Sequence, residues 1–181
     1  MNGCRRSSGF TLLEALVVMA LVAVLAGIAA PAMSRLRQEQ RMQGLAEALL
    51  SSLMLARIDA MRHQQRVTVC ARAAEERCAP AGPWTPGWIV FMDSNANAQR
   101  ESHELLLQTQ SALPTGLKLV GNTTVSRYVS YGAEGRSLTV SGAFQAGTLS
   151  LCQEGAHQAW DLVINALGKP RLVKVSANGC D

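Results

Sequence analysis

The stretch GFTLLEALVVMALVAVLAGIAAPAM, Gly9 to Met33, is an almost uninterrupted apolar run that contains one carboxylate. Between Phe10 and Ala30 the polar side chains are Thr11 and Glu14. Because an α-helix rises ~1.5 Å per residue, this run is long enough to cross a hydrocarbon core of ~30 Å. We therefore expect residues 10–33 to form a transmembrane helix.

The carboxylate of Glu14 is unusual in such a segment, because an ionisable group in lipid is costly and commonly marks a functional residue with a charged partner. A second interpretation is that Glu14 lies near the helix end, where its side chain reaches the membrane interface. Physical chemistry alone leaves both interpretations open.

A secretory signal peptide is an alternative, since Arg5 and Arg6 precede the apolar run. Signal peptides have an apolar region of ~7–15 residues, then a small-residue cleavage site and a separate mature domain. Here the helical pattern continues beyond the run, and the rest of a twin-arginine signal is missing. Cys4 has no apolar region before it, so a lipoprotein signal fits equally poorly.

A short leader with two arginines, then Gly9 and the string Phe10-Thr-Leu-Leu-Glu14, resembles the class III signal of type IV pilins and type II secretion pseudopilins. The resemblance implies that residues 1–9 are a leader, which a prepilin peptidase removes after Gly9 on the cytoplasmic side before it methylates the amine of Phe10. It also implies that Glu14 pairs with the N-terminal ammonium of a neighbouring subunit during assembly. Such pairing would offset the cost of a charge in low dielectric.

Pro31 lies where the helix of this family carries a proline, and a proline inside a helix removes one hydrogen bond and kinks it. The alternative is that Pro31 only ends the span. Basic residues flank the span on both sides, so their distribution does not orient the chain. The resemblance implies one pass through the inner membrane with the N-terminus cytoplasmic and the head periplasmic, followed by transfer to a pilus at the cell surface.

After the span, apolar residues recur every three or four positions, which predicts an amphipathic helix over residues 34–64. These residues are Leu45, Leu49, Leu53, Ala56 and Ala60. From residue 65 to 181 the pattern changes to short β-rich runs separated by glycine, proline and asparagine. We expect strands at 66–71, 87–92, 103–108, 116–120, 126–131, 137–141, 148–152, 160–165 and 170–176. The predicted fold class is α+β: a long N-terminal helix packed on a mainly antiparallel, pilin-like head.

The chain has 181 residues and a net charge of +4. Removal of the leader takes away two arginines and no acid, which leaves a mildly basic mature chain. Its length suits one span and one domain of about 120–140 residues. Neither its length nor its charge indicates two large domains or a nucleic-acid-binding tail.

Four cysteines remain after loss of the leader, namely Cys70, Cys78, Cys152 and Cys180, an even number that suits an oxidising periplasm. Three pairings are possible. We predict Cys70 with Cys78 and Cys152 with Cys180, because two of the predicted strands end at or next to a cysteine. Zinc is the alternative, but no C-x-x-C pair or nearby histidine pair supports it.

The segment from Asp93 through Asn95 and Asn97 to Glu104 imitates a calcium loop. Ala98 replaces the glycine of that pattern, and the flanking segments are predicted strands instead of helices. A hairpin loop rich in turn formers is the preferred interpretation. We expect no bound metal or cofactor.

Catalytic motifs are missing from the sequence: the three histidines are scattered, and there is neither a G-x-S-x-G elbow nor a phosphate-binding loop. We therefore do not expect an enzyme, although a membrane-anchored periplasmic enzyme is a third class of function. Trp84, Trp88 and Trp160 are expected to pack in the core or loops, not to stack on bases.

Four strings of the head resemble the FimT/GspH branch of minor pilins and pseudopilins. They are residues 87–106, 129–137, 141–152 and 162–180. This resemblance implies a minor pilin of a type IV pilus, with other pilins, the prepilin peptidase, the inner membrane and double-stranded DNA as partners. A GspH-type pseudopilin of a type II secretion system is the alternative.

DNA binding in the FimT side of the family is implied to use a basic C-terminal G-R-x-R motif, which Gly168-Lys169-Pro170-Arg171 resembles. Lysine in place of the first arginine keeps the charge but loses the planar fork that binds phosphate. We predict Lys169, Arg171 and Lys174 as the DNA-binding residues. In an extended strand Lys174 would face away from Lys169 and Arg171, so it could join them only through a turn, a bulge or its long stem. An ordinary solvated strand end is the competing interpretation.

Overall fold

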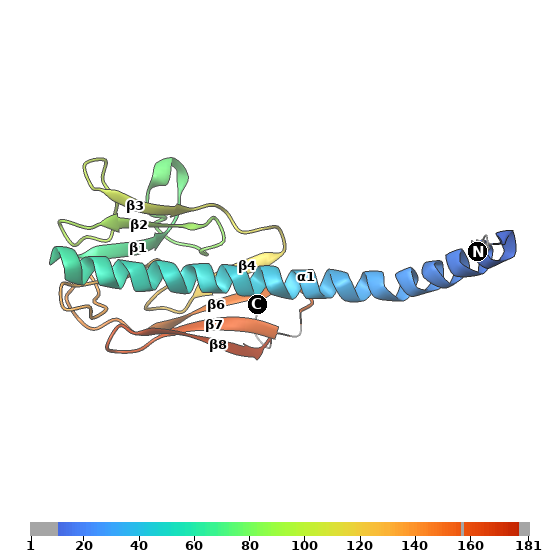
Figure 1. The fold of residues 1–181 in the computed structure, drawn as a ribbon. Coiled ribbons are helices and arrows are strands. Elements are labelled where there is room, and N and C mark those ends of the chain that lie inside the picture. The colour runs from blue at the N-terminus through green and yellow to red at the C-terminus, as the bar shows by residue number, and fades with distance from the viewer. Residues whose placement is uncertain (1–10, 157, 178–181) are drawn as a thin grey trace, which may run out of the picture. The chain divides into compact units, whose positions relative to one another are not determined.

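The computed structural model describes residues 11–156 and 158–177, with backbone alone at residues 29–32, 34 and 35 (Figure 1). The predicted processing residues Gly9 and Phe10 lie outside the described residues, as does Cys180. The chain divides into two compact units, Met1–Arg41 and Met42–Asp181, which are considered separately.

Helix α1 runs from Leu12 to His63, a length of 52 residues. The helix ends close to the predicted position and continues through Pro31, so this proline does not end it. No helical segment among the described residues is long and apolar enough to cross a membrane. The transmembrane helix and the kink at Pro31 stay predictions.

The part of α1 in the second unit is held by a buried stripe of six residues spaced alternately by four and three. They are Met42, Ala46, Leu49, Leu53, Ala56 and Ala60. Three of them are alanines, so the helix backbone can lie close to the strands beneath it. Four of the five positions predicted for this face are buried, and Leu45 packs at its border.

Eight strands form two antiparallel sheets of four strands each. The first has the order β3-β2-β1-β5, with β1 at Val67–Ala71, β2 at Trp88–Met92, β3 at Leu106–Gln110 and β5 at Tyr128–Tyr131. The second has the order β4-β6-β7-β8, with β4 at Leu117–Gly121, β6 at Gly147–Gln153, β7 at Gln158–Ile164 and β8 at Pro170–Ser176. A short 3-10 helix, Ala74–Glu76, follows β1.

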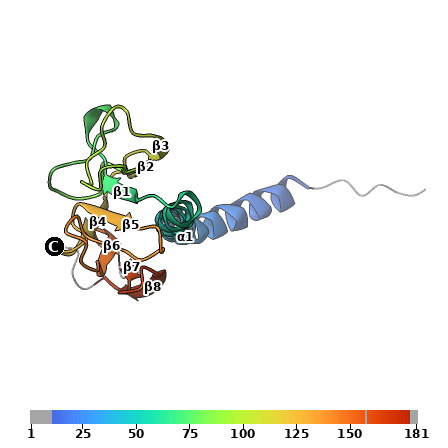
Figure 2. The same ribbon diagram turned by 90° about the vertical axis from the view of Figure 1, so that its left-hand side faces the viewer.

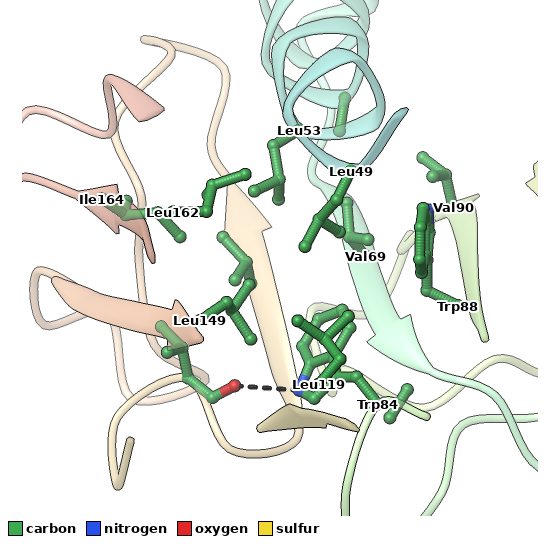
Figure 3. Packing of buried hydrophobic residues seen from close by; sticks show 14 of the residues in the cluster. Leu49, Leu53, Val69, Trp84, Trp88, Val90, Leu119, Leu149, Leu162 and Ile164 are labelled. Atoms are coloured by element: carbon green, nitrogen blue, oxygen red, sulfur yellow. Dashed lines mark hydrogen bonds between the residues drawn. The ribbon is translucent and has the colours of Figure 1, made fainter. Parts of the chain in front are cut away.

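One core joins both sheets to α1, and Figure 3 shows side chains from all three meeting in it. Figure 2 looks nearly along the last turns of α1, with both sheets on one side of the helix. Trp88 is fully buried and its Nε1 donates to Ser52 Oγ on α1 at 3.0 Å. Trp84 Nε1 donates to the carbonyl of Ser126 at 3.1 Å. These two tryptophans therefore pack in the core, as predicted.

The prediction of a strand over residues 137–141 is wrong: this segment makes only isolated bridges, Tyr131 with Ser137 and Leu138 with Phe144. Two tight turns explain the difference. Arg136 O accepts from Gly132 N at 3.0 Å, and Ala143 O accepts from Thr139 N at 2.8 Å. Because the chain reverses at both turns, only Ser137 and Leu138 lie between them, and their pairing stays at single bridges.

Candidate functional site

The β7–β8 turn carries the basic residues singled out in the sequence. The side-chain oxygen of Asn165 accepts from the backbone N–H of Leu167 at 3.1 Å and from that of Lys169 at 2.9 Å. Gly168 N–H donates to the carbonyl of Asn165 at 2.9 Å. One asparagine side chain thus organises the turn, as turn-forming asparagines commonly do, while the Lys169 side chain stays exposed.

Gly168 is required at its position for two reasons. Its φ is +75°, a conformation that residues with a Cβ rarely adopt. A Cβ placed there would also lie 2.6 Å from Ser137 N and 2.9 Å from Gly135 O, which are both backbone atoms. The β7–β8 turn therefore packs directly on the segment 135–137, and only glycine allows that approach.

Strand β8 places its cations on opposite faces. Arg171 lies opposite Val163 and Lys174 lies opposite Trp160 in the same antiparallel register, so they differ in parity. Leu172, on the same face as Lys174, packs against the core. The Lys174 ammonium lies 5.9 Å from the Trp160 ring centroid. β8 therefore presents Arg171 and Lys174 on opposite faces, as the predicted alternation requires, while Lys169 precedes the strand in the turn.

Sequence reasoning missed two arginines near this turn. Arg57 Nε, on α1, donates to the carbonyl of Gly135 at 2.7 Å. Arg136 is the next residue and is exposed. The glycines at 132, 135 and 168 were the only signal available, because each marks a tight turn or a close backbone approach.

The calcium-like segment is a loop between β2 and β3 whose carboxylates bind the loop's own N–H groups. Asp93, 1% exposed, accepts from Asn97 N at 3.0 Å, from Ala98 N at 3.1 Å and from Thr68 Oγ1 at 2.7 Å. Glu104, 4% exposed, accepts from Ser94 N at 2.8 Å and from Glu101 N at 3.1 Å. The predicted hairpin loop is confirmed by its flanking strands.

Two carboxyl groups in this loop have opposite pKa shifts. Burial raises the pKa of Glu104 above its ordinary value. The hydrogen bond from the Asn97 side chain is the largest cause that lowers the pKa of Glu101. In the described part of the chain, no group of three or more His, Cys, Asp and Glu residues is placed to hold a metal ion.

Cys70 and Cys78 form a disulfide, which confirms that predicted pair. Cys152 is also disulfide-bonded. Because Cys180 lies outside the described residues, the pair Cys152 with Cys180 stays a prediction.

Glu14 lies in the first turn of α1 with its side chain exposed. Its N–H donates to Thr11 Oγ1 at 3.3 Å, and Ala15 N–H donates to the carbonyl of Thr11 at 3.1 Å. Thr-x-x-Glu is the pattern of a capping box, and a carboxylate at a helix N-terminus is favoured by the helix dipole. A glutamate at position 14 therefore also favours the start of the helix, a local role that the sequence interpretation missed.

Two family models match the chain, one at its N-terminus and one over most of the head. The model of a prokaryotic N-terminal methylation motif matches residues 4–30. The model of the type II transport protein GspH matches residues 45–168, well over half of the chain. No curated protein matches the sequence at a significant level.

Two crystal structures of one minor pilin show the same fold. The type IV minor pilin FimU of Pseudomonas aeruginosa strain PAO1 has a TM-score of 0.59 and 17% sequence identity, and the match covers 80% of this chain and 98% of that chain. A second crystal form of FimU gives a TM-score of 0.56 at 17% identity, over 77% of this chain and 99% of that one. The minor pseudopilin EpsH of the type 2 secretion system of Vibrio cholerae gives 0.46 at 14% identity, over 77% and 99%. The predicted pilin-like α+β fold is thereby confirmed, and the chain belongs to the type II transport protein GspH family.

Proposed function

We propose that this protein is a minor pilin of a type IV pilus, cleaved between Gly9 and Phe10 and inserted through its N-terminal helix. One observation carries the proposal: an N-terminal methylation motif at residues 4–30 and a GspH-family region at 45–168 occur in one chain. The first unit supports it, because α1 exposes a dense set of large apolar side chains there. They include Leu12, Leu13, Leu16, Val17, Leu21, Val24, Leu25 and Ile28. Lipid before assembly, and neighbouring helices after it, would cover this surface.

In this proposal Glu14 is the assembly residue, and its exposed carboxylate pairs with the methylated ammonium of Phe10 in a neighbouring subunit. Glu14→Ala should still insert into the membrane, since loss of a carboxylate eases transfer of the helix into lipid. Incorporation into filaments should fall, as measured by immunoblotting of sheared surface fractions. Glu14→Gln is the matched control for size: equal loss in both variants supports a charge requirement. Normal incorporation of both would remove the pairing role.

Processing has its own test. Gly9→Glu should accumulate an uncleaved precursor, because the peptidase needs a small residue before the scissile bond. Mass spectrometry of the N-terminus measures this, and a mature chain that begins at Phe10 in that variant would contradict the cleavage site.

A GspH-type pseudopilin of a type II secretion system is the second candidate, favoured by the description of the matching family. Disruption of the gene separates the two functions. Loss of surface pili or of natural transformation supports the minor pilin. Loss of protein secretion with intact pili supports the pseudopilin.

We further propose that the head binds double-stranded DNA, independently of sequence, through Lys169 and Arg171. Both side chains are exposed, and Arg171 lies on the outer face of β8. Contacts to phosphates carry no base information and release counterions, so binding should weaken steeply with salt.

The full chain in mild detergent and a short labelled duplex provide the test, by fluorescence anisotropy at several salt concentrations. Lys169→Ala/Arg171→Ala should weaken binding about tenfold. Each phosphate contact changes the affinity by roughly threefold between about 50 and 200 mM salt, and two contacts are removed. Arg127→Ala/Lys174→Ala removes two exposed cations elsewhere and controls for net charge. Equal affinities of the two double variants would remove the proposed site.

A further inference from the structure

Two turns that are distant in the sequence meet at Gly168. One is the β7–β8 turn, and the other is the turn over residues 132–136, closed by Gly132 N–H donating to the carbonyl of Arg136 at 3.0 Å. A Cβ on Gly168 would lie 3.1 Å from the carbonyl carbon of Arg136. The backbone of Arg136 therefore touches the residue that immediately precedes Lys169.

The 132–136 turn is also fixed from its other side by α1. Gly135 has a φ of +71°, and a Cβ there would lie 2.6 Å from Met61 Sδ. Arg57 Nε donates to the carbonyl of the same glycine at 2.7 Å. Because α1 and the β7–β8 turn both pack on it, the 132–136 turn holds the Arg136 backbone in a defined place.

The side chain of Arg136 is exposed. Glu75 forms an ion pair with Arg77, whereas no described carboxylate forms one with Arg136, Lys169 or Arg171. Arg136, Lys169 and Arg171 therefore keep their charges uncompensated by a carboxylate contact in the described chain. Three cations on adjacent backbone segments outnumber the one exposed carboxylate of the 132–136 turn, Glu134, a balance that favours polyanions.

We propose that Arg136 is a third phosphate-binding residue of the DNA site, next to Lys169 and Arg171, and that Lys174 is not part of that site. The inference rests on the proposed DNA binding. Arginine offers the planar fork that Lys169 lacks, so Arg136 supplies bidentate phosphate contact where the turn itself has lysine. Lys174 faces the opposite side of β8 and lies over Trp160.

The test compares single variants of the full chain in detergent with the labelled duplex at several salt concentrations. Arg136→Gln should weaken binding about threefold and reduce the slope of log affinity against log salt by about 1. Arg136→Lys should restore the salt slope, since the charge returns, but only part of the affinity, since lysine cannot make the bidentate contact. Lys174→Gln removes the same charge from the other face and should change affinity less than twofold.

The outcomes separate this inference from the proposed function. If the unaltered chain binds no duplex at low salt, the proposed DNA binding fails. If it binds, and Lys169→Ala/Arg171→Ala weakens binding while Arg136→Gln behaves like Lys174→Gln, only the role of Arg136 is overturned. Circular dichroism and near-ultraviolet spectra of Arg136→Gln should match those of the unaltered chain, because this exposed side chain makes no described contact.

Discussion

The acidic β2–β3 loop and the basic β7–β8 turn treat their charged side chains in opposite ways. In the loop, Asp93 and Glu104 are buried and accept hydrogen bonds from the loop's own backbone. In the turn, the neutral side chain of Asn165 binds the backbone, and the Lys169 and Arg171 side chains remain exposed.

This contrast teaches how to separate structural from functional charges. A carboxylate whose lone pairs are filled by nearby N–H groups stabilises the loop that carries it. A cation that makes no contact within its own chain keeps its capacity for a partner. The sequence offers both motifs as possible ligand sets, although it favours a hairpin loop for the acidic one. The hydrogen-bond partners show that the carboxylates of this loop bind its own backbone.

The largest expected effect breaks the acidic loop. Asp93→Ala removes the acceptor of Ala98 N and the nearer acceptor of Asn97 N, together with the bond from Thr68, and should lower the free energy of unfolding by about 4 kcal/mol. Urea unfolding of the full chain in detergent, followed by the fluorescence of Trp84 and Trp88, measures it. Asn95→Ala is the control in the same loop: its side chain makes two exposed bonds, one to Glu101 and one from Asn97 N, so the cost should stay below about 1 kcal/mol.

Equal losses in these two variants would mean that the buried hydrogen bonds of Asp93 do not hold the loop. DNA binding by Asn95→Ala should equal that of the unaltered chain, since the loop has no part in the proposed basic site.

The next effect tests the packing beneath the basic turn. Gly168→Ala forces a Cβ against Ser137 N and Gly135 O at a positive φ, and should lower the free energy of unfolding by about 3 kcal/mol. Gly155→Ala is closely matched, because Gly155 has a φ of +74° but nothing within 4 Å of its Cβ position. Its cost should be about 1 kcal/mol, from conformation alone.

The difference between these two glycine variants isolates the contact between the β7–β8 turn and the segment 135–137. If both variants lose the same stability, the close approach at Gly168 contributes nothing beyond its backbone conformation.

The fold was largely predictable from the sequence because its periodicities are strong. The buried stripe of α1 and eight of the nine predicted strands are present, since alternation and spacing report burial directly. The strand expected at 137–141 was wrong because tight turns at 132–136 and 139–143 leave room only for single bridges between them. β3 begins later than expected because Glu104 belongs to the acidic loop.

The candidate site was only partly predictable. Lys169 and Arg171 stand together in the sequence, and strand alternation separated Lys174 correctly. Arg136 could not be found, because its place depends on a packing contact at Gly168 between segments about thirty residues apart. No local pattern reports such a contact, since it depends on tertiary packing.

The smallest expected effect concerns the two glutamates of the acidic loop, whose pKa values move in opposite directions. Burial raises the pKa of Glu104 above its ordinary value of 4.5, so the folded chain holds that proton more tightly than the unfolded chain. Stability from this group is therefore present below pH 4.5 and is lost as the pH rises through the folded pKa. The pKa of Glu101 is lowered, mainly by the Asn97 side chain, so its contribution is present above pH 4.5 and is lost as the pH falls through the folded pKa.

Glu104→Gln removes the first contribution, together with part of the acceptor set for Ser94 and Glu101 N–H. The loss of the hydrogen-bond acceptor does not depend on pH. The informative quantity is therefore how the difference in free energy of unfolding between the variant and the unaltered chain changes with pH. The free energy of unfolding of Glu104→Gln minus that of the unaltered chain should rise as the pH is raised from about 4 to about 7. For Glu101→Gln, the free energy of unfolding of the variant minus that of the unaltered chain should instead rise as the pH falls below 4.5. Urea unfolding at a series of pH values measures both. Parallel curves for the unaltered chain and Glu104→Gln would show that this carboxyl is not strained by burial, and the acidic loop would then differ from the basic turn only in its hydrogen bonds.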